Sequence, residues 1–433
     1  MTNEAAFDPA HLVQADQVHR DLYTSPAVFA HEMQRLWPRS WLFVGHESQV
    51  PAAGDFITTV LGGQPVLLLR QPDGGMAVLH NRCAHKGAPL VSAPAGRAGP
   101  VLRCPYHGWA YRPDGRLIGM PQPEGYADSK LAHCPAQQGL ARYGRVAAHR
   151  GFVFAQADQT GPGFDEALGP MCDALDLLAD RSPAGRLKVA GAPLKTLVHA
   201  NWKLYLENIN DAFHPVTTHA SVTQAANAVW KAQPADTAQA PALQQLLPFG
   251  SGYDFFERMG ARVLPHGHSV LGTQSSLHSA YAGIPGYQPA LEAAHGAARA
   301  HEVLAFAPQN VVIYPSIAIK GVPQVMRVLR PLAVDRTVVE AWAFEAEGAP
   351  RELLAAALMY NRQVFSPLSM VAHDDLHLFE GQQAALASRG NPWVSLHRGT
   401  GPSPDAEPPR EVNGIDEALL RNQYRAWVQG MQG

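Results

Sequence analysis

Four potential metal ligands lie between residues 83 and 107 of this 433-residue sequence. They form two pairs, Cys83-Ala84-His85 and Cys104-Pro105-Tyr106-His107, with eighteen residues between them. Each pair would present one thiolate and one imidazole at the tip of a loop. This donor set fits a [2Fe-2S] centre held by two cysteines and two histidines. It also fits a tetrahedral zinc site, so spacing alone leaves both metals open.

A second group of candidate ligands lies at Asp211, His214 and His219. Asp211 and His214 are three residues apart and would share one helix face, where a carboxylate can fix the tautomer of a metal-bound imidazole. His214 and His219 would point about 140° apart on a regular helix, so they converge only if Pro215 bends it. Two histidines and a distant carboxylate form the facial triad of non-haem Fe(II) oxygenases. A histidine pair on a helix is more often structural, so its context must decide.

The residues around both groups resemble one enzyme family. The runs Cys-Ala-His-Lys-Gly at 83–87 and Cys-Pro-Tyr-His-Gly-Trp at 104–109 resemble the two loops of a Rieske domain. Lys86 stands where that family usually has arginine, which removes no ligand. Asn201-Trp202-Lys203 and Glu207-Asn208, ahead of the histidine pair, resemble the catalytic domain of the large (α) subunit of aromatic-ring-hydroxylating dioxygenases. The short spacing from Glu207 to Asp211 resembles the branch that acts on benzoate-like, salicylate-like and terephthalate-like acids.

The resemblance implies a role for each candidate ligand. It implies a [2Fe-2S] cluster at Cys83, His85, Cys104 and His107. It also implies a mononuclear Fe(II) at His214, His219 and an aspartate late in the chain. Asp374 and Asp375 are both candidates, and Asp375 is preferred because the second aspartate of such a pair is the ligand in similar proteins. Asp211 would link His214 to His107 of a neighbouring subunit.

The resemblance also implies an activity and partners. The expected reaction inserts both atoms of O2 into an aromatic ring as a cis-diol, with electrons from NAD(P)H passing through a separate reductase and sometimes a ferredoxin. No G-x-G-x-x-G sequence opens a helix, which supports a separate reductase. The expected assembly is a ring of three large subunits, α3, or α3β3 with a smaller subunit. The alternatives are a mono-oxygenase or demethylase on the same two sites, and a non-enzymatic electron-transfer or zinc-stabilised binding protein.

Composition excludes several other classes. The net charge is −3, from 34 basic and 37 acidic residues, and no Lys/Arg run exceeds two, so neither a nucleic acid nor an anionic membrane is an expected partner. No apolar run reaches the ~18 residues of a membrane span, and the N-terminus lacks a secretory core. We therefore expect a cytoplasmic protein with reduced thiols, in which Cys134 and Cys172 are buried and structural.

The order of predicted elements indicates an α+β protein. Residues 41–155 alternate short β-rich runs with Gly and Pro turns and predict an all-β Rieske domain. The pattern over residues 156–433 predicts a catalytic domain with an antiparallel sheet flanked by helices, and the resemblance implies that this domain is of the helix-grip (START-like) kind. Residues 1–40 predict a helical segment, with a docking helix over 17–37. The Ala/Gln/Pro-rich run 234–248 predicts a mobile flap over a pocket.

An aromatic carboxylate would need a buried cation, because an unpaired charge in an apolar pocket costs several kcal/mol. The candidates on the late strands are Lys320, Arg327 and Arg330. Arg327 and Arg330 are three apart and would face opposite sides of a strand. Arg330 precedes Pro331 and is expected at the rim, and Lys320 is expected in a turn beside Gly321. Arg327 is therefore the preferred anchor.

Overall fold

The computed structural model describes residues 8–134, 138–278, 283–321, 325–401 and 408–432. The chain divides into two compact units. The smaller unit is residues 37–166, and the larger unit combines the described residues of 1–36 with those of 167–433.

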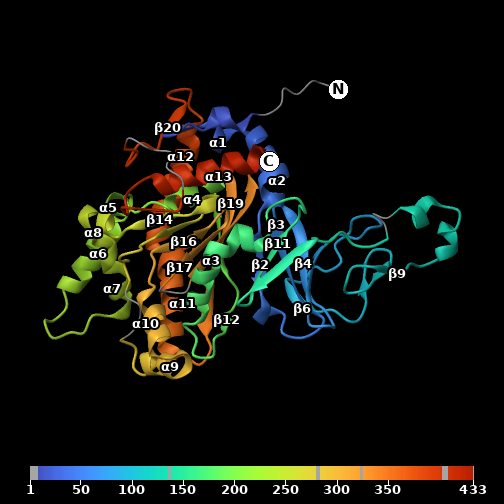
Figure 1. Ribbon diagram of the computed structural model, residues 1–433, viewed down its shortest axis with the longest axis horizontal. Coiled ribbons are helices and arrows are strands. Elements are labelled where there is room, and N and C mark those ends of the chain that lie inside the picture. The colour runs from blue at the N-terminus through green and yellow to red at the C-terminus, as the bar shows by residue number, and fades with distance from the viewer. Residues whose placement is uncertain (1–7, 135–137, 279–282, 322–324, 402–407, 433) are drawn as a thin grey trace. The chain divides into compact units, whose positions relative to one another are not determined.

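The smaller unit contains three antiparallel sheets, with strand orders β10-β11-β2, β5-β4-β3-β6 and β7-β8-β9 (Figure 1). Their bounds are β2 Leu42–His46, β3 Asp55–Leu61, β4 Gln64–Arg70, β5 Met76–His80, β6 Ala95–Arg97, β7 Leu102–Arg103, β8 Ala110–Tyr111, β9 Leu117–Gly119, β10 Arg145–His149 and β11 Phe152–Gln156. Leu67, Leu79 and Trp109 are buried in a core that also contains Cys83 and Cys104. The candidate thiolate ligands therefore sit against this core.

The larger unit is built on a nine-stranded antiparallel sheet with the order β12-β19-β18-β17-β16-β15-β14-β21, in which β13 also pairs with β19. Its strands are β12 Leu187–Val189, β13 Leu194–Val198, β14 Ala261–Val263, β15 Ser269–Leu271, β16 Asn310–Ile313, β17 Ile317–Lys320, β18 Val325–Ala333, β19 Arg336–Ala346 and β21 Arg410–Val412. The central strands β16, β17 and β18 are almost wholly buried, because helices and loops cover them.

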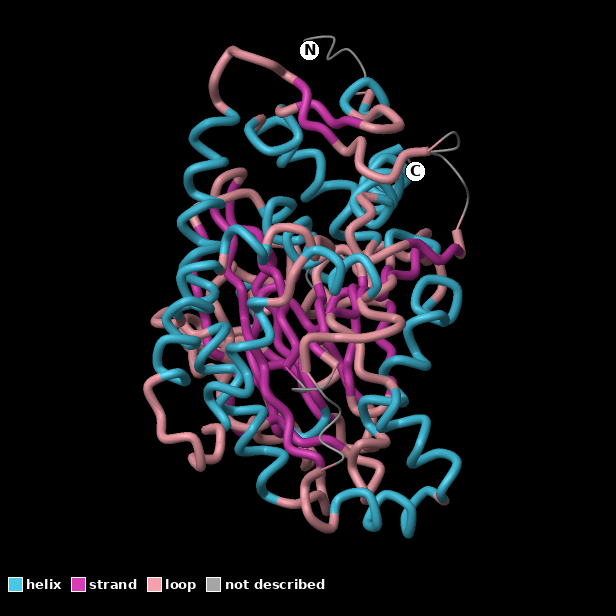
Figure 2. The backbone as a smooth tube through the Cα atoms, turned by 90° about the vertical axis from the view of Figure 1, so that its left-hand side faces the viewer, coloured by secondary structure: helices cyan, strands magenta, loops and turns pink. Residues whose placement is uncertain are grey.

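Helices surround this sheet, as Figure 2 shows in cyan beside the magenta strands. They are α1 Asp21–Thr24, α2 Pro26–Arg39, α3 Phe164–Ala179, α4 Trp202–Ile209, α5 Pro215–Thr218, α6 Ala220–Lys231, α7 Pro241–Leu246, α8 Tyr253–Arg258, α9 Tyr287–His295, α10 Ala297–Ala305, α11 Arg351–Phe365, α12 Met370–Leu386 and α13 Ala418–Gln432. A β-rich unit and an antiparallel sheet flanked by helices confirm the predicted α+β class.

The N-terminal segment differs from the predicted helix over 17–37. Residues 17–19 form strand β1, which pairs with β20 (Trp393–Ser395), and the long helix begins only at Pro26. This pairing joins distant parts of the sequence, which periodicity cannot reveal. Glu32 of α2 is fully buried and accepts hydrogen bonds from Trp202, Lys203 and Trp427. Helix α2 is thus hydrogen-bonded through Glu32 to α4 and α13.

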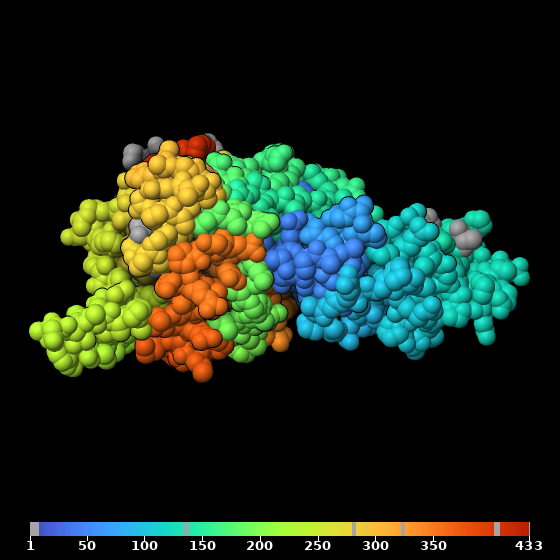
Figure 3. Space-filling view, turned by 90° about the horizontal axis from the view of Figure 1, so that it is seen from below, coloured from blue at the N-terminus to red at the C-terminus, as the bar shows by residue number. Residues whose placement is uncertain are grey.

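The run predicted as a mobile flap, residues 234–248, divides into two parts that differ in structure. Residues 232–240 are mostly exposed and project between α6 and α7, as the yellow-green atoms in Figure 3 show. Residues 241–250 instead form α7 and a 3-10 turn, and Leu246 and Phe249 are buried in the core of the larger unit. None of the helices in the described ranges has the length and apolar character that crossing a membrane requires.

Candidate metal centres

Two loops of the smaller unit have the same backbone conformation. In each, the cysteine N–H donates to the carbonyl five residues on, and its carbonyl accepts from the glycine four residues on. Gly87 and Gly108 have φ of 75° and 71°, which a side chain would disfavour. The sequences C-x-H-x-G (83–87) and C-x-x-H-G (104–108) therefore form matching turns around Cys83 and Cys104, although the histidine lies one residue further from the cysteine in the second.

The two predicted histidines lie together at these loops. The ring centres of His85 and His107 are 4.7 Å apart, and His85 stacks on Trp109 with an angle of 5° between the rings. Nδ1 of His85 is buried without a hydrogen-bond partner. Both cysteines are buried and free, so two thiolates lie inward of two imidazoles. This arrangement fits a [2Fe-2S] cluster with cysteines on one iron and histidines on the other.

No disulfide joins the four cysteines, all of which lie within the described residues. Cys134 and Cys172, however, are half-buried rather than buried. The prediction that these two thiols are fully buried is therefore wrong.

The sequence analysis placed the second group of ligands on one helix, and the structure shows that they do not lie within one helix. Helix α4 ends at Ile209. Asp211 then forms a turn by accepting hydrogen bonds from the N–H groups of Phe213 (2.7 Å) and His214 (3.2 Å). This is the local side-chain turn that aspartate favours. Pro215 then begins the new helix α5, where its missing N–H costs nothing. A break in the helix, and not a bend, turns His214 toward His219.

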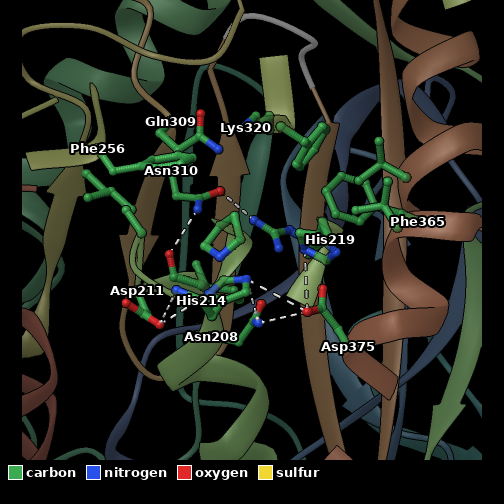
Figure 4. Close-up of a pocket in the computed structure, with 18 of the residues that line it drawn as sticks. Asn208, Asp211, His214, His219, Phe256, Gln309, Asn310, Lys320, Phe365 and Asp375 are labelled. Atoms are coloured by element: carbon green, nitrogen blue, oxygen red, sulfur yellow. Dashed lines mark hydrogen bonds and ion pairs between the residues drawn. The ribbon is translucent and has the colours of Figure 1, made fainter. Parts of the chain in front are cut away.

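His214, His219 and Asp375 converge in the larger unit (Figure 4). One ligand atom from each lies within 4.8 Å of the others, and no other three His, Cys, Asp or Glu residues of the described ranges form such a group. Oδ1 of Asp375 is 3.7 Å from Nε2 of His214 and 3.6 Å from Nε2 of His219. Two imidazole nitrogens and one carboxylate oxygen facing one point fit a facial-triad iron site.

The two adjacent aspartates of α12 have different contacts. Asp375 faces the two Nε2 atoms, whereas Oδ2 of Asp374 lies 3.5 Å from Nδ1 of His219, on the far side of that ring. Asn208 was not assigned a role from the sequence beyond its place in the motif. Its Nδ2 lies 3.0 Å from Nε2 of His214 and donates to Asp375 Oδ1 at 3.1 Å.

Burial and neighbouring charges act in opposite directions on these groups. Burial lowers the pKa of His214, but Asp211 and Asp375 outweigh burial and hold that pKa above its ordinary value. Burial raises the pKa of Asp375 to about 6, although His214 and Asn208 favour its charged form. Burial and the nearby charge of His214 lower the pKa of His219 to about 4. A divalent cation would offset the cost of burying the Asp375 carboxylate.

A cavity of about 60 Å³ opens next to the three ligands. Lys320 and Arg327 both line it. Lys320 is the last residue of strand β17 and is 2% exposed, so its predicted place in a turn is wrong. Arg330 is 6% exposed and pairs with Glu340 at 3.3 Å, so its predicted place at a solvated rim is also wrong. Lys320 and Arg330 both lie on interior strands of the large sheet. The neighbouring Gly321 and Pro331 suggested the ends of strands, because these residue types are common in turns.

Comparison with known proteins gives the family. Residues 40–138 match the Rieske [2Fe-2S] domain, and residues 178–433, more than half of the chain, match the ring hydroxylating alpha subunit (catalytic domain). The chain belongs to the ring-hydroxylating alpha-subunit family. Its members combine a [2Fe-2S] cluster with a mononuclear iron, and both donor sets described above are present in this member.

Individual relatives agree with this family. The anthranilate 1,2-dioxygenase large subunit of Acinetobacter baylyi is 30% identical over 88% of this chain and 80% of its own length. Toluate 1,2-dioxygenase subunit alpha of Pseudomonas putida is 27% identical over 95% of this chain and 90% of its own. A structure of naphthalene 1,2-dioxygenase with indole bound shares the fold, with a TM-score of 0.79 and 24% identity, over 99% of this chain and 95% of that one.

Proposed function

We propose that this ring-hydroxylating alpha subunit is the oxygenase component of a multicomponent dioxygenase that cis-dihydroxylates an aromatic carboxylate. The observation that carries the proposal is the convergence of His214, His219 and Asp375 beside a cavity that also contains buried cations. The cluster would supply single-electron transfer, and an iron held by His214, His219 and Asp375 would supply the oxygen chemistry beside the organic substrate. Family membership supports this enzymatic interpretation over the electron-transfer or zinc-binding alternative.

The proposed ligand assignments follow from the two donor sets. Cys83, His85, Cys104 and His107 would hold the cluster, and His214, His219 and Asp375 would hold the iron. Residues 41–155 would form the electron-carrying domain and residues 156–433 the catalytic domain. Asp211 would connect His214 to His107 of a neighbouring copy, in an α3 or α3β3 assembly. Electrons would come from NAD(P)H through a reductase, with or without a ferredoxin.

Arg327 is the proposed anchor for the substrate carboxylate. Its guanidinium lines the cavity and donates to Oδ1 of Asn310 at 2.6 Å, and its buried Nε has no hydrogen-bond partner among the described residues. Phe365 packs against the guanidinium, with its ring centre 4.6 Å from Cζ of Arg327. An arginine fixed in this way has a donor free for an anionic oxygen. Anthranilate and toluate, the acids for which two relatives are named, are aromatic carboxylates.

The test is a panel of aromatic acids and neutral arenes, given to the holoenzyme with a reductase. Product formed is measured against oxygen consumed, with labelled oxygen. Two labelled atoms in the product support the dioxygenase, and one labelled atom supports the mono-oxygenase or demethylase alternative.

The variant Arg327→Met tests the anchor. We expect KM for the acid to rise roughly a hundredfold, because a buried carboxylate loses its partner, while a neutral analogue keeps its activity. Arg362→Met, on the exposed part of α11, is the matched control. Equal losses with the acid and the neutral analogue would rule out Arg327 as the anchor.

A further inference from the structure

The register of the β17–β18 hairpin places a second cation beside Arg327. Ala318 pairs with Arg327, and Lys320 pairs with Val325. Directly opposed residues share a face of the sheet, as do residues two apart on a strand. Lys320 and Arg327 are therefore diagonal neighbours on one face, and both side chains line the cavity beside the metal ligands. Figure 4 labels Lys320 in this lining.

Lys320 is buried without an anionic partner among the described residues. It is 2% exposed, and no hydrogen bond or ion pair of its ammonium is found within the described ranges. Its described aromatic neighbour is Tyr360, whose ring centre is 5.9 Å from Nζ. Burial, and then the charge of Arg327, lower the pKa of Lys320 well below its ordinary value. Two basic side chains therefore line the cavity next to each other, and an anionic group bound there would favour the charged form of Lys320.

Several other buried cations of the larger unit have acidic partners, as Arg421 has in Asp416 at 2.8 Å. Arg330 pairs with Glu340, and Lys203 pairs with Glu32 at 2.5 Å. Burying a charge is costly unless it is paired, so most buried lysines and arginines have such a partner. Among the residues that the structure describes, Lys320 lacks such a partner, and it lies at the wall of the proposed substrate cavity, where a ligand could supply the anion.

We propose that Lys320 binds a second acidic group of the substrate, so that the ring carries two carboxylates. This inference rests on the proposed function, in which Arg327 binds the first carboxylate. A monocarboxylate would balance only one of the two cations, whereas a benzenedicarboxylate would balance both. Lys320 is then a specificity-determining residue, because a ring that lacks the second acid leaves its amine buried and unpaired.

The experiment measures binding and turnover of benzoate and of benzene-1,2-, 1,3- and 1,4-dicarboxylate by the holoenzyme with its reductase. Kd is measured by calorimetry without oxygen, and KM from product formed. We expect at least one dicarboxylate to bind more tightly than benzoate. Lys320→Met should weaken that dicarboxylate roughly a hundredfold, while benzoate changes less than about threefold.

Two further variants keep the result clear. Lys320→Gln gives the same comparison with a polar side chain if the methionine variant folds poorly, and Lys188→Met changes an exposed lysine of β12 as a control. Equal weakening of benzoate and the dicarboxylate would overturn the inference, because Lys320 would then share the first carboxylate. Turnover of benzoate with no binding of any dicarboxylate would also overturn it, yet leave the proposed function standing. Turnover of neutral arenes alone would instead refute the aromatic-acid substrate on which it rests.

Discussion

Oδ2 of Asp211 lies 3.2 Å from Nδ1 of His214, so the carboxylate accepts the Nδ1 proton and leaves Nε2 facing Asp375. The same carboxylate caps the backbone N–H groups of the turn that follows α4. One side chain therefore stabilises the turn after α4 and also sets the tautomer of a proposed iron ligand.

Asp211→Asn should separate these two roles. The amide keeps an oxygen for the turn but removes the charge that orients His214, so both metals should stay bound. We expect the reduced cluster to be reoxidised roughly 10- to 100-fold more slowly by oxygen in the presence of substrate. Stopped-flow absorbance of the cluster measures this rate, with Asp236→Asn, at an exposed site, as the control. An unchanged rate would mean that Asp211 is only a turn residue.

Asp374 and Asp375 should differ in their effect on iron. Asp375→Ala removes the oxygen that faces both Nε2 atoms, so mononuclear iron should be lost. Asp374→Ala removes only the contact with Nδ1 of His219, so iron should remain, with affinity weakened by roughly 10- to 100-fold. Mononuclear iron is measured during titration with a chelator, as total iron minus cluster iron. Cluster iron is taken as equal to acid-labile sulfide, because a [2Fe-2S] cluster contains one sulfide per iron. Loss of iron in Asp374→Ala alone would transfer the ligand role to Asp374.

Cys104→Ser should remove the cluster and spare the mononuclear iron. Cys104 lies in the smaller unit, whereas His214, His219 and Asp375 lie in the larger one, which has its own core. We expect loss of the visible chromophore and of labile sulfide, with one iron retained per chain. Cys172→Ser, at a half-buried thiol of α3, should change neither metal. A wild-type protein with zinc and no labile sulfide would contradict the cluster assignment.

Glu207 should make the free energy of unfolding depend on pH. Burial raises its pKa to about 7 from 4.5, even though the hydroxyls of Tyr23 and Tyr424 donate to it. The folded protein therefore holds this proton more tightly than the unfolded chain does. The resulting stabilisation is full below pH 4.5 and is lost as the pH rises through about 7.

Glu207→Gln should abolish that contribution. Between pH 5 and pH 8, the free energy of unfolding measured with urea should fall by on the order of 3 kcal/mol more in wild type than in the variant. The control is Glu352→Gln, at an exposed position of α11, which should follow wild type. Parallel pH profiles for wild type and Glu207→Gln would contradict the prediction.

The sequence by itself predicted the class of fold and the family correctly, and it identified the candidate residues of the two donor sets. Ligands close in sequence can be recognised without a structure, because the spacing of Cys83 and His85, or of Asp211 and His214, limits the shapes of the loops that hold them. The β-rich runs and the turn residues between them likewise predicted an antiparallel sheet, because side-chain alternation is a local property.

Tertiary structure decided everything that depends on segments distant in the sequence. Asn208 and Asp375 are 167 residues apart and form a hydrogen bond only because α4 and α12 pack together. Residues 17–19 became a strand because residues 393–395 lie beside them. Lys320 was expected in a turn, but the pairing of β17 with β18 places it at the cavity wall. Helix packing and strand register arise from contacts across the chain, and a single sequence carries no direct record of which segments will meet.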